Sequence, residues 1–400
     1  ALQIGLASTM LDVLPGVSSC TFNFFGGAGR GKTLLLSTVA SLFGNTTAPG
    51  HGSAGRNGTS LIETFGSTEF ALQAKGQATS IGPMLIDEIG SSNYGTLDNF
   101  IYRTGNGNSR TRLSSNGDVQ ESPPRVLFSM TTGEVPITSM LSRNAQQGVL
   151  DRGVDINIGG GTVSFEGQGA EEYAFLPEDV KKALSAGIPC QYGTVAPAFI
   201  KALLSEMDRQ NWKAELDEVR QYLVDVCPNY VSNVGPDRVL TRFALAVLAG
   251  RIALRNKVFS SELVDETTLL NGMLICIELW IRTRWHYLEI LSAALILQKK
   301  IPEGAPRFGL PLYRHQEASG GMPTLMISKE FLEKIFSGAE EVEIIGKRFK
   351  NDGLLVRADA GRNTVGKNPH YHLRMEWLKD HSIEWSESLE RFVETVSDED

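Results

Sequence analysis

Cysteine is scarce in this chain, which has four cysteines among its 400 residues. They stand singly, with no Cys-x-x-Cys pair and no histidine at the spacing of metal ligands: Cys20, Cys190, Cys227 and Cys276. This pattern argues against a disulfide framework and a zinc site, and it suits a reducing compartment such as the cytoplasm. No apolar run is long enough to cross a bilayer, so we predict no membrane partner.

A surplus of positive charge is also missing, because 46 acidic residues stand against 38 basic ones and the net charge is −8. This balance excludes a uniformly basic nucleic-acid-binding protein but allows local basic patches. The length suggests two or three domains. The chain begins at Ala1 within an apolar stretch that has neither a basic leading segment nor a cleavage pattern, so we expect the cut end of a longer protein.

The sequence patterns predict four parts in order. Residues 1–165 alternate β-rich runs with helical patterns, which is typical of an α/β core. Residues 166–300 predict a helical domain, residues 301–380 a small α/β unit and residues 381–400 an acidic tail. We expect core strands over residues 18–25, 84–86, 125–130 and 154–158, a core helix over 32–43, and long helices over 237–256 and 262–299.

A glycine-rich turn between the first expected strand and helix fits the pattern GxxxxGK[ST] of phosphate-binding loops. Such a loop turns backbone N–H groups towards phosphate oxygens, and the helix that follows directs its positive end at the anion. Lys32 would contact the β- and γ-phosphates of ATP, and the Thr33 hydroxyl would bind Mg²⁺. The predicted nucleotide site comprises Gly26, Gly27, Ala28, Gly29, Arg30, Gly31, Lys32 and Thr33.

Two carboxylates, Asp87 and Glu88, end the strand expected over residues 84–86. A P-loop enzyme that hydrolyses its nucleotide needs a carboxylate at the end of a neighbouring strand. We therefore predict that Asp87 holds Mg²⁺ through water and that Glu88 orients and deprotonates the attacking water. The alternative is a strand that ends in two solvated acids.

Two further segments supply candidate catalytic residues. Additional-strand ATPases carry a polar residue at the tip of a strand between the two that bear these motifs, and Thr131 or Thr132 would occupy that place. Arg152 precedes the last core strand, where an arginine could reach a neighbouring subunit and stabilise charge on the transferring phosphoryl group. The alternatives are a strand-end turn for the threonines and a surface ion pair with Asp151 or Asp155 for the arginine.

These elements, in this order, resemble an AAA+ ATPase, and they are similar to a bacterial and phage family catalogued as domain of unknown function 927. The resemblance rests on the P-loop, the strand ending in Asp-Glu, the strand running into Thr-Gly-Glu and an Arg-Phe-Ala helix, and it covers roughly residues 1–300. It implies a parallel-sheet AAA+ core with a helical lid. The stretch from about 165 to 235 departs from the family and leaves the lid topology open.

The resemblance also implies a helicase of mobile elements, similar to superfamily 3 and MCM-type motors, that forms a ring such as a hexamer. Leu150-Asp151-Arg152 before a strand is similar to the arginine-finger segment of MCM proteins. Arg238 resembles a sensor 2 arginine that contacts the nucleotide. Arg242 is the competing candidate, and spacing does not separate the two.

The Asn116-Gly117 dipeptide predicts a tight hairpin between the Asp-Glu strand and the next core strand. In the motors that the chain resembles, a hairpin at this place lines the pore and grips one DNA strand. Arg110 and Arg112 would then contact phosphates. The alternative is a solvated surface hairpin.

The C-terminal unit has the pattern strand, helix, helix, strand, turn and strand, which resembles a winged helix. We expect Ser328 to cap the first helix, a second helix over 339–351, and wing strands over 354–358 and 371–375. Basic residues outnumber acidic ones from 347 to 374, which suits duplex or fork DNA. The predicted DNA contacts are Lys347, Arg348, Lys350, Arg357, Arg362 and Lys367. The alternative is a winged helix that binds protein.

The end of the chain is strongly acidic, and we expect a mobile tail there that could shield the basic unit or bind a partner. Together the patterns favour an ATP-dependent DNA helicase or translocase of a phage or mobile element, with ATP bound between subunits of a homo-oligomeric ring and primase or other replication proteins as partners. The alternative is an ATP-gated switch or loader that remodels a protein partner without unwinding DNA. A DNA packaging motor is disfavoured, because no nuclease-like acid cluster follows the ATPase core.

Overall fold

The computed structural model divides into two compact units. Unit 1 comprises residues 1–227 and 236–283, and unit 2 comprises residues 228–235 and 284–400. The structure describes residues 1–46, 60–65, 82–91, 94–106, 112–113, 119–120, 126–140, 152–158, 161–165, 168–173, 178–207, 211–227, 237–298, 301–302, 312–315, 324–336, 342, 345–346, 349, 353–356, 363–365, 368–380 and 383–394.

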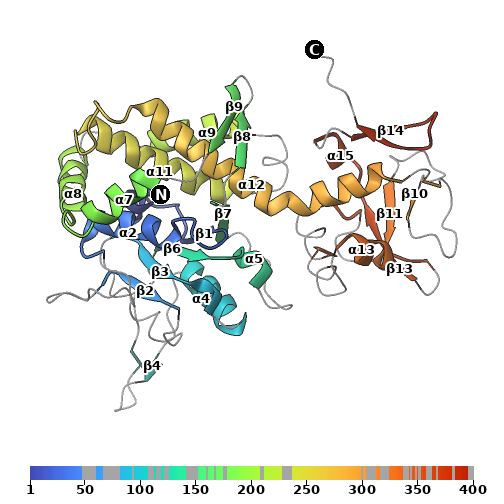
Figure 1. Cartoon of the computed structure of the whole chain (residues 1–400), viewed down its shortest axis with the longest axis horizontal. Helices are drawn as coiled ribbons and strands as arrows, with labels where there is room; N and C mark the ends of the chain where they lie inside the picture. The colour runs from blue at the N-terminus through green and yellow to red at the C-terminus, as the bar shows by residue number, and fades with distance from the viewer. Residues whose placement is uncertain are drawn as a thin grey trace. The chain divides into compact units, whose positions relative to one another are not determined.

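Unit 1 is built around a five-stranded sheet in the order β2-β3-β6-β1-β7, in which every neighbouring pair is parallel (Figure 1). Its strands are β1 (Cys20–Phe25), β2 (Ile62–Thr64), β3 (Met84–Asp87), β6 (Phe128–Gly133) and β7 (Gly153–Asn157). β1 and β6 are buried at every position, as central strands covered on both faces are. The sheet confirms the α/β prediction, and β6 lies between β1 and β3.

Successive side chains of a strand point to opposite faces, so this sheet has two cores. On one face, Phe22 of β1 contacts Phe128 of β6 and Phe243, with ring centroids 5.3 and 5.7 Å apart. On the other face, Met84 and Ile86 of β3 pack in an apolar cluster with η2 (Ile89–Ser91), α4 (Tyr94–Asn106) and α5 (Ile137–Met140). α2 (Lys32–Phe43) has the bounds that the sequence predicts, and α1 (Leu2–Ala7) with η1 (Ser8–Met10) is largely buried.

The described chain from residue 178 to 296 is mostly helical, whereas residues 168–173, also within the segment predicted as helical, form a strand. It forms α7 (Glu178–Gly187), α8 (Val195–Glu206), α9 (Trp212–Val226), α11 (Asp237–Arg255) and α12 (Glu266–Ile296). α12 begins later than the predicted residue 262, because the Asp265 carboxylate accepts a hydrogen bond from Thr268 N (2.7 Å) and so caps the helix there.

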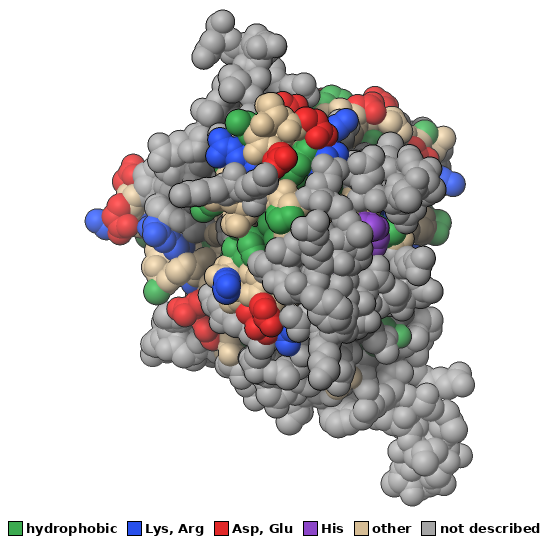
Figure 2. All heavy atoms as spheres, turned by 90° about the vertical axis from the view of Figure 1, so that its right-hand side faces the viewer, with side chains coloured by type: hydrophobic (Ala, Val, Ile, Leu, Met, Phe, Trp, Pro, Cys, Tyr) green, Lys and Arg blue, Asp and Glu red, His purple; other side chains and the backbone are tan. Residues whose placement is uncertain are grey.

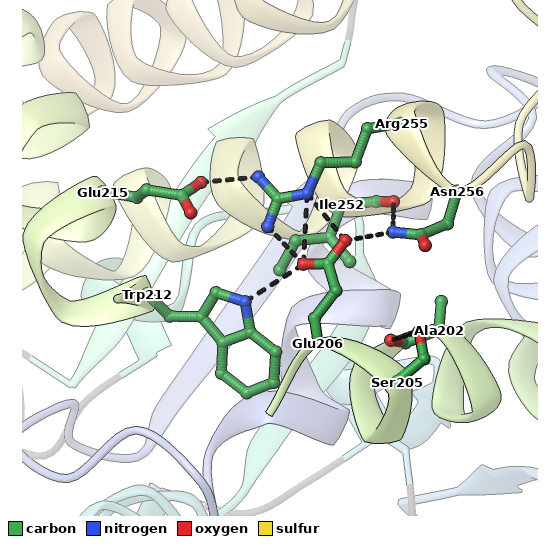
Figure 3. Close-up of polar contacts among 8 residues, drawn as sticks. All are labelled: Ala202, Ser205, Glu206, Trp212, Glu215, Ile252, Arg255 and Asn256. Carbon is green, nitrogen blue, oxygen red and sulfur yellow. Dashed lines mark hydrogen bonds and ion pairs between the residues drawn. The ribbon is translucent and has the colours of Figure 1, made fainter. Parts of the chain in front are cut away.

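A polar network around Glu206 joins α8, α9 and α11 within unit 1 (Figure 3). The Glu206 carboxylate accepts hydrogen bonds from Arg255 Nε (2.9 Å), Asn256 Nδ2 and Trp212 Nε1 (3.3 Å), and Arg255 Nη1 also donates to Glu215 (2.6 Å). Burial by itself would raise the pKa of Glu206, but these hydrogen bonds outweigh it and hold the pKa below its ordinary value.

Two short antiparallel hairpins complete the described strands of residues 1–227. β4 (Arg112–Leu113) pairs with β5 (Val119–Gln120), on either side of the predicted Asn116-Gly117 turn, which lies outside the described residues. β8 (Gly161–Phe165) pairs with β9 (Gln168–Tyr173).

Unit 2 holds a four-stranded antiparallel sheet in the order β10-β11-β13-β12. Its strands are β10 (Leu312–His315), β11 (Thr324–Ser328), β12 (Asn363–Val365) and β13 (Asn368–Leu373). α13 (Lys329–Ile335) starts as predicted, since Ser328 Oγ accepts a hydrogen bond from Phe331 N (3.1 Å). Within the second predicted helix, the described residues 342, 345–346 and 349 are helical.

The expected wing differs in part from the observed hairpin. In the described part of the strand predicted over 354–358, Leu355 forms an antiparallel bridge with Leu373, Val356 N donates to His372 O (3.0 Å) and Arg374 N donates to Leu354 O (2.7 Å). β12 lies within the segment predicted as a turn and pairs Val365 with Asn368. Two residues separate this pair, which is the spacing of a tight hairpin. The predicted turn was therefore wrong in its described part, whereas the pairing of residues 354–356 with 372–374 agrees with the predicted wing.

The acidic segment also differs from the mobile tail that its charge predicts. After α15 (Trp377–Asp380), β14 (Ile383–Ser386) and β15 (Arg391–Glu394) form an antiparallel hairpin. Ile383 and Phe392 are buried, and the Phe392 ring contacts Trp385 edge to face at 5.2 Å. Alternating apolar side chains therefore order residues 383–394, and the prediction of mobility was wrong for them.

Candidate functional site

The glycine-rich turn connects the carboxyl end of β1 to the start of α2. Gly29 and Gly31 have φ angles of +75° and +84°, a left-handed conformation that other residues adopt only with strain. A Cβ atom on either would meet nothing within 4 Å, so conformation rather than crowding requires glycine at these positions. Gly26 N donates to Gly133 O (3.2 Å), which fixes the turn against the end of β6. An uncrowded backbone turn at a helix N-terminus is well suited to an anion.

Lys32, the first residue of α2, bends back over this turn. Its Nζ atom donates to Gly26 O (2.6 Å) and Gly27 O (2.9 Å). The ammonium group is therefore held beside the backbone of the turn, where it adds positive charge to that of the helix N-terminus. The rest of the predicted loop, Ala28 and Arg30, lies between these glycines.

The Thr33 hydroxyl, the Asp87 carboxylate and the Thr132 hydroxyl meet at the carboxyl edge of the sheet. Thr33 Oγ1 donates to Asp87 Oδ2 (3.0 Å), and Thr132 Oγ1 donates to Asp87 Oδ1. These side chains come from α2, β3 and β6, and they meet because β3 and β6 are parallel neighbours. Hydroxyl and carboxylate oxygens are the ligands that Mg²⁺ prefers, so the group fits that ion.

Glu88 follows β3 with an unusual backbone. Its φ angle is +60°, which is uncommon for a residue other than glycine and costs about 1–3 kcal/mol. Glu88 N donates to Thr132 Oγ1 (3.3 Å), so one threonine hydroxyl contacts both predicted acidic residues. A Cβ on Gly133 would lie 2.8 Å from Ile89 Cγ2, which shows how closely β6 approaches this turn.

Thr131 points to the opposite face of the sheet. Its hydroxyl donates to Asn23 Oδ1 (3.1 Å), and Asn23 Nδ2 donates to Asp155 Oδ1 (2.7 Å). Asp155 Oδ1 also accepts from Ile137 N (2.7 Å), in the chain after β6. The structure therefore brings Thr132 to the carboxylates and separates Thr131 from them. The sequence analysis missed Asn23, which joins Thr131 to Asp155 by hydrogen bonds, although a polar residue in an apolar strand was a visible signal.

Arg152 lies at the far end of the sheet from the glycine-rich turn. Its backbone oxygen accepts from Thr21 N (2.8 Å) at the start of β1, whereas the turn follows the end of β1. Its guanidinium carbon is 5.4 Å from the centre of the Tyr102 ring. Gly105 of α4 leaves room for this side chain, because a Cβ there would lie 1.9 Å from Arg152 Cδ. The described contacts place Arg152 away from the turn of its own chain.

The two candidate sensor arginines are in different surroundings. Arg242 is 1% exposed, and its Nη2 and Nε atoms donate to Ser18 Oγ (2.8 Å) and Ser18 O (3.2 Å). It therefore anchors the start of β1, opposite the glycine-rich turn. Arg238 lies one turn earlier on α11 and is exposed.

Cys20, at the start of β1, lies beside Arg242. Burial raises the pKa of the Cys20 thiol to about 11, against the opposite effect of Arg242, so this thiol stays protonated at neutral pH.

The predicted DNA contacts fall largely outside the described residues, namely Arg110, Lys347, Arg348, Lys350, Arg357, Arg362 and Lys367. Arg112 is described in its backbone and pairs with Gln120 in β4–β5. Figure 2 shows one face of the molecule, where the described basic and acidic side chains are interspersed with apolar ones. Among the side chains described on that face, no large area carries a single sign of charge.

The described part of the chain lacks two features that would point to other functions. It holds no helix with both the length and the hydropathy of a membrane span. It also holds no group of three or more His, Cys, Asp and Glu side chains that could bind a metal ion.

Comparison with known proteins gives one family and one solved structure. Residues 1–123 match the family described as "Domain of unknown function (DUF927)". The fold resembles a solved structure titled "SCCmec type IV Cch - active helicase", with a TM-score of 0.58 and 16% sequence identity over 95% of this chain and 67% of that one. No curated protein sequence matches the chain. The chain is thus a mixed α/β protein with a helicase-like fold, and its first third resembles that family.

Proposed function

We propose that this chain is an AAA+ ATPase that hydrolyses ATP to move along DNA. The observation that carries the proposal is the meeting of Thr33, Asp87, Thr132 and Glu88 beside the glycine-rich turn. A helix N-terminus with an ammonium group suits the phosphates of a nucleotide, and a hydroxyl–carboxylate pair suits their Mg²⁺ ion. The order of the sheet, with β6 between β1 and β3, supports the additional-strand class.

Each residue of the site has a role in this proposal. Lys32 binds the β- and γ-phosphates, and Thr33 and Asp87 hold Mg²⁺, which neutralises charge on the phosphates when it is bound. Glu88 accepts the proton of the attacking water. Thr132 fixes Asp87 and the Glu88 backbone, so it takes the sensor role for which Thr131 competed.

Arg152 would serve the site of a neighbouring subunit. Its place at the opposite end of β1 and β7 from the turn supports a role in trans, and an oligomer such as a hexameric ring would bring it to the next subunit. Arg238, exposed on α11, remains the candidate for the sensor 2 arginine. The competing candidate, Arg242, donates a hydrogen bond to Ser18 and is the weaker choice.

The proposed substrate is DNA, because the fold resembles that of a helicase and the sequence pairs it with basic C-terminal segments. One strand would pass the β4–β5 hairpin with its Arg110 and Arg112, and a duplex or fork would contact the C-terminal unit. The sequence resemblance to helicases of mobile elements further favours replication proteins as partners.

Steady-state ATPase assays with single variants test the nucleotide site. Lys32→Ala should abolish hydrolysis together with nucleotide binding, whereas Glu88→Gln should abolish hydrolysis and keep binding. Lys201→Ala, an exposed lysine of α8, is the control and should leave both unchanged. Hydrolysis by Lys32→Ala at the unaltered rate would overturn the proposal.

Mixing experiments test the role of Arg152 in trans. Arg152→Ala should lose ATPase activity, and adding inactive Lys32→Ala subunits should restore part of it, since each supplies what the other lacks. Arg220→Ala, a half-buried arginine of α9, is the matched control. Full activity of dilute, monomeric Arg152→Ala would refute a finger in trans. Strand displacement on a forked duplex then separates a helicase from an ATP-gated switch, which would hydrolyse ATP without unwinding.

A further inference from the structure

A cavity of about 510 Å³ opens in unit 2, far in sequence from the proposed ATP site. Its walls are mainly apolar and include Met375, Leu378 of α15, Ile383 and Trp385 of β14. All of its lining residues belong to unit 2. The volume lies in the range of sites for small organic ligands.

An arginine–tryptophan stack forms part of this wall. The guanidinium carbon of Arg314 lies 4.7 Å from the centre of the Trp385 ring, and Arg314 Nη1 is bound to Glu387 (3.1 Å). The Arg314 side chain is only 9% exposed, and the Phe392 ring contacts the indole edge to face at 5.2 Å. The wall therefore offers a rigid, flat surface of the kind on which aromatic ligands stack.

Two cations border the same cavity. Arg374 and Lys379 line it and are exposed, so they lie at its opening to solvent, whereas the charge of Arg314 is offset by Glu387. Two carboxylates, Glu376 and Glu384, also line it. A ligand with a flat apolar part for the interior and an anionic part for the opening complements this arrangement. A nucleobase with its phosphate has both properties.

We propose that this cavity binds one nucleotide, with the base against Trp385 and the phosphate at Arg374 and Lys379. Stacking on an aromatic side chain beside cations is how proteins bind single-stranded nucleic acid without strict sequence preference. The nucleotide could belong to a strand or be free in solution, and the choice of a strand rests on the proposed function. Binding at the cavity itself does not depend on ATP hydrolysis.

Fluorescence anisotropy with a labelled single-stranded deoxythymidine oligomer of about ten nucleotides, without ATP, tests the proposal on the full chain. Trp385→Leu should weaken binding about tenfold, and Trp385→Phe should keep most of it. Arg374→Gln should weaken binding several-fold and reduce its salt dependence, because one phosphate contact is lost. Lys334→Gln, an exposed lysine of α13 outside the cavity, is the charge-matched control.

A second arm separates the two sources of the nucleotide. In the Lys32→Ala background, thymidine monophosphate should compete with the oligomer if the cavity accepts a free nucleotide, whereas absence of competition would assign the site to a strand. The proposal is overturned if Trp385→Leu and Arg374→Gln, with the melting profile of the unaltered chain, bind the oligomer as tightly as Lys334→Gln does. That result would leave DNA-stimulated ATPase activity intact, so failure here differs from failure of the proposed function.

Discussion

Replacement of Thr131 or Thr132 by valine, one at a time, makes the same chemical change at two adjacent positions and so tests the role of each hydroxyl. Valine keeps the shape of threonine and replaces its hydroxyl with a methyl group. Thr132→Val deletes the donor to Asp87 and the acceptor of Glu88 N, whereas Thr131→Val deletes the donor to Asn23. The two hydroxyls lie on opposite faces of β6, so the variants should fail in different ways.

The Thr132 hydrogen bond involves a carboxylate, and such bonds contribute about 1.5–3 kcal/mol. If this energy serves to hold the catalytic geometry, kcat for ATP should fall about 10- to 100-fold, at about 1.4 kcal/mol per factor of ten. The Glu88 backbone, strained at φ +60°, would lose its restraint as well.

Thr131→Val should act on stability instead. It takes a donor from the fully buried Asn23 side chain, which costs about 1–3 kcal/mol, while kcat per folded molecule stays within about twofold. ATP turnover and thermal melting of both variants, measured side by side, give the comparison. Equal loss of turnover in the two variants, or undiminished turnover in Thr132→Val, would refute the reasoning.

Three further predictions concern packing and pH. In urea unfolding curves, Glu206→Gln should destabilise unit 1 by about 2 kcal/mol at neutral pH. Because the pKa of Glu206 is lowered in the folded state, the difference in unfolding free energy between the two proteins should vanish as the pH falls below 4.5 and through that folded pKa. Phe392→Ala should destabilise unit 2 by about 3–5 kcal/mol in the same assay, and no effect would mean that residues 383–394 are mobile after all. Gly133→Ala should lower the melting temperature through the contact with Ile89 Cγ2, and adding Ile89→Leu, which removes that atom, should restore it.

Local signals predicted the core of unit 1 well. The bounds of α2 were correct because left-handed glycines precede the helix and Gly44 follows it. The strand predicted over 125–130 runs instead over Phe128–Gly133, since Thr131 and Thr132 pair with Asn23 and Phe24 of β1. That register joins segments over a hundred residues apart, and so the choice between the two threonines could not be made from the sequence.

Other differences arose where one signal concealed another. The charge of the acidic segment hid the alternation Ile383-Glu384-Trp385-Ser386, which is the pattern of a half-buried strand. The spacing of Arg242 in the sequence suits a sensor 2 arginine as well as that of Arg238 does. Its burial against Ser18 depends on how α11 packs on the sheet, which the sequence does not give. Short strands such as β2 have too few residues for a periodic pattern.

Strand β7 links two reactions if Arg152 acts in trans. Arg152, the residue directly before the strand, would complete the ATP site of the adjacent subunit. Asp155, within the strand, contacts Asn23 and the chain after β6 in its own subunit. Three residues of extended chain, about 10 Å, separate the two. Turnover in one subunit would then be sensed by the next, and ATPase activity should fall more steeply than linearly as inactive subunits are mixed into the ring.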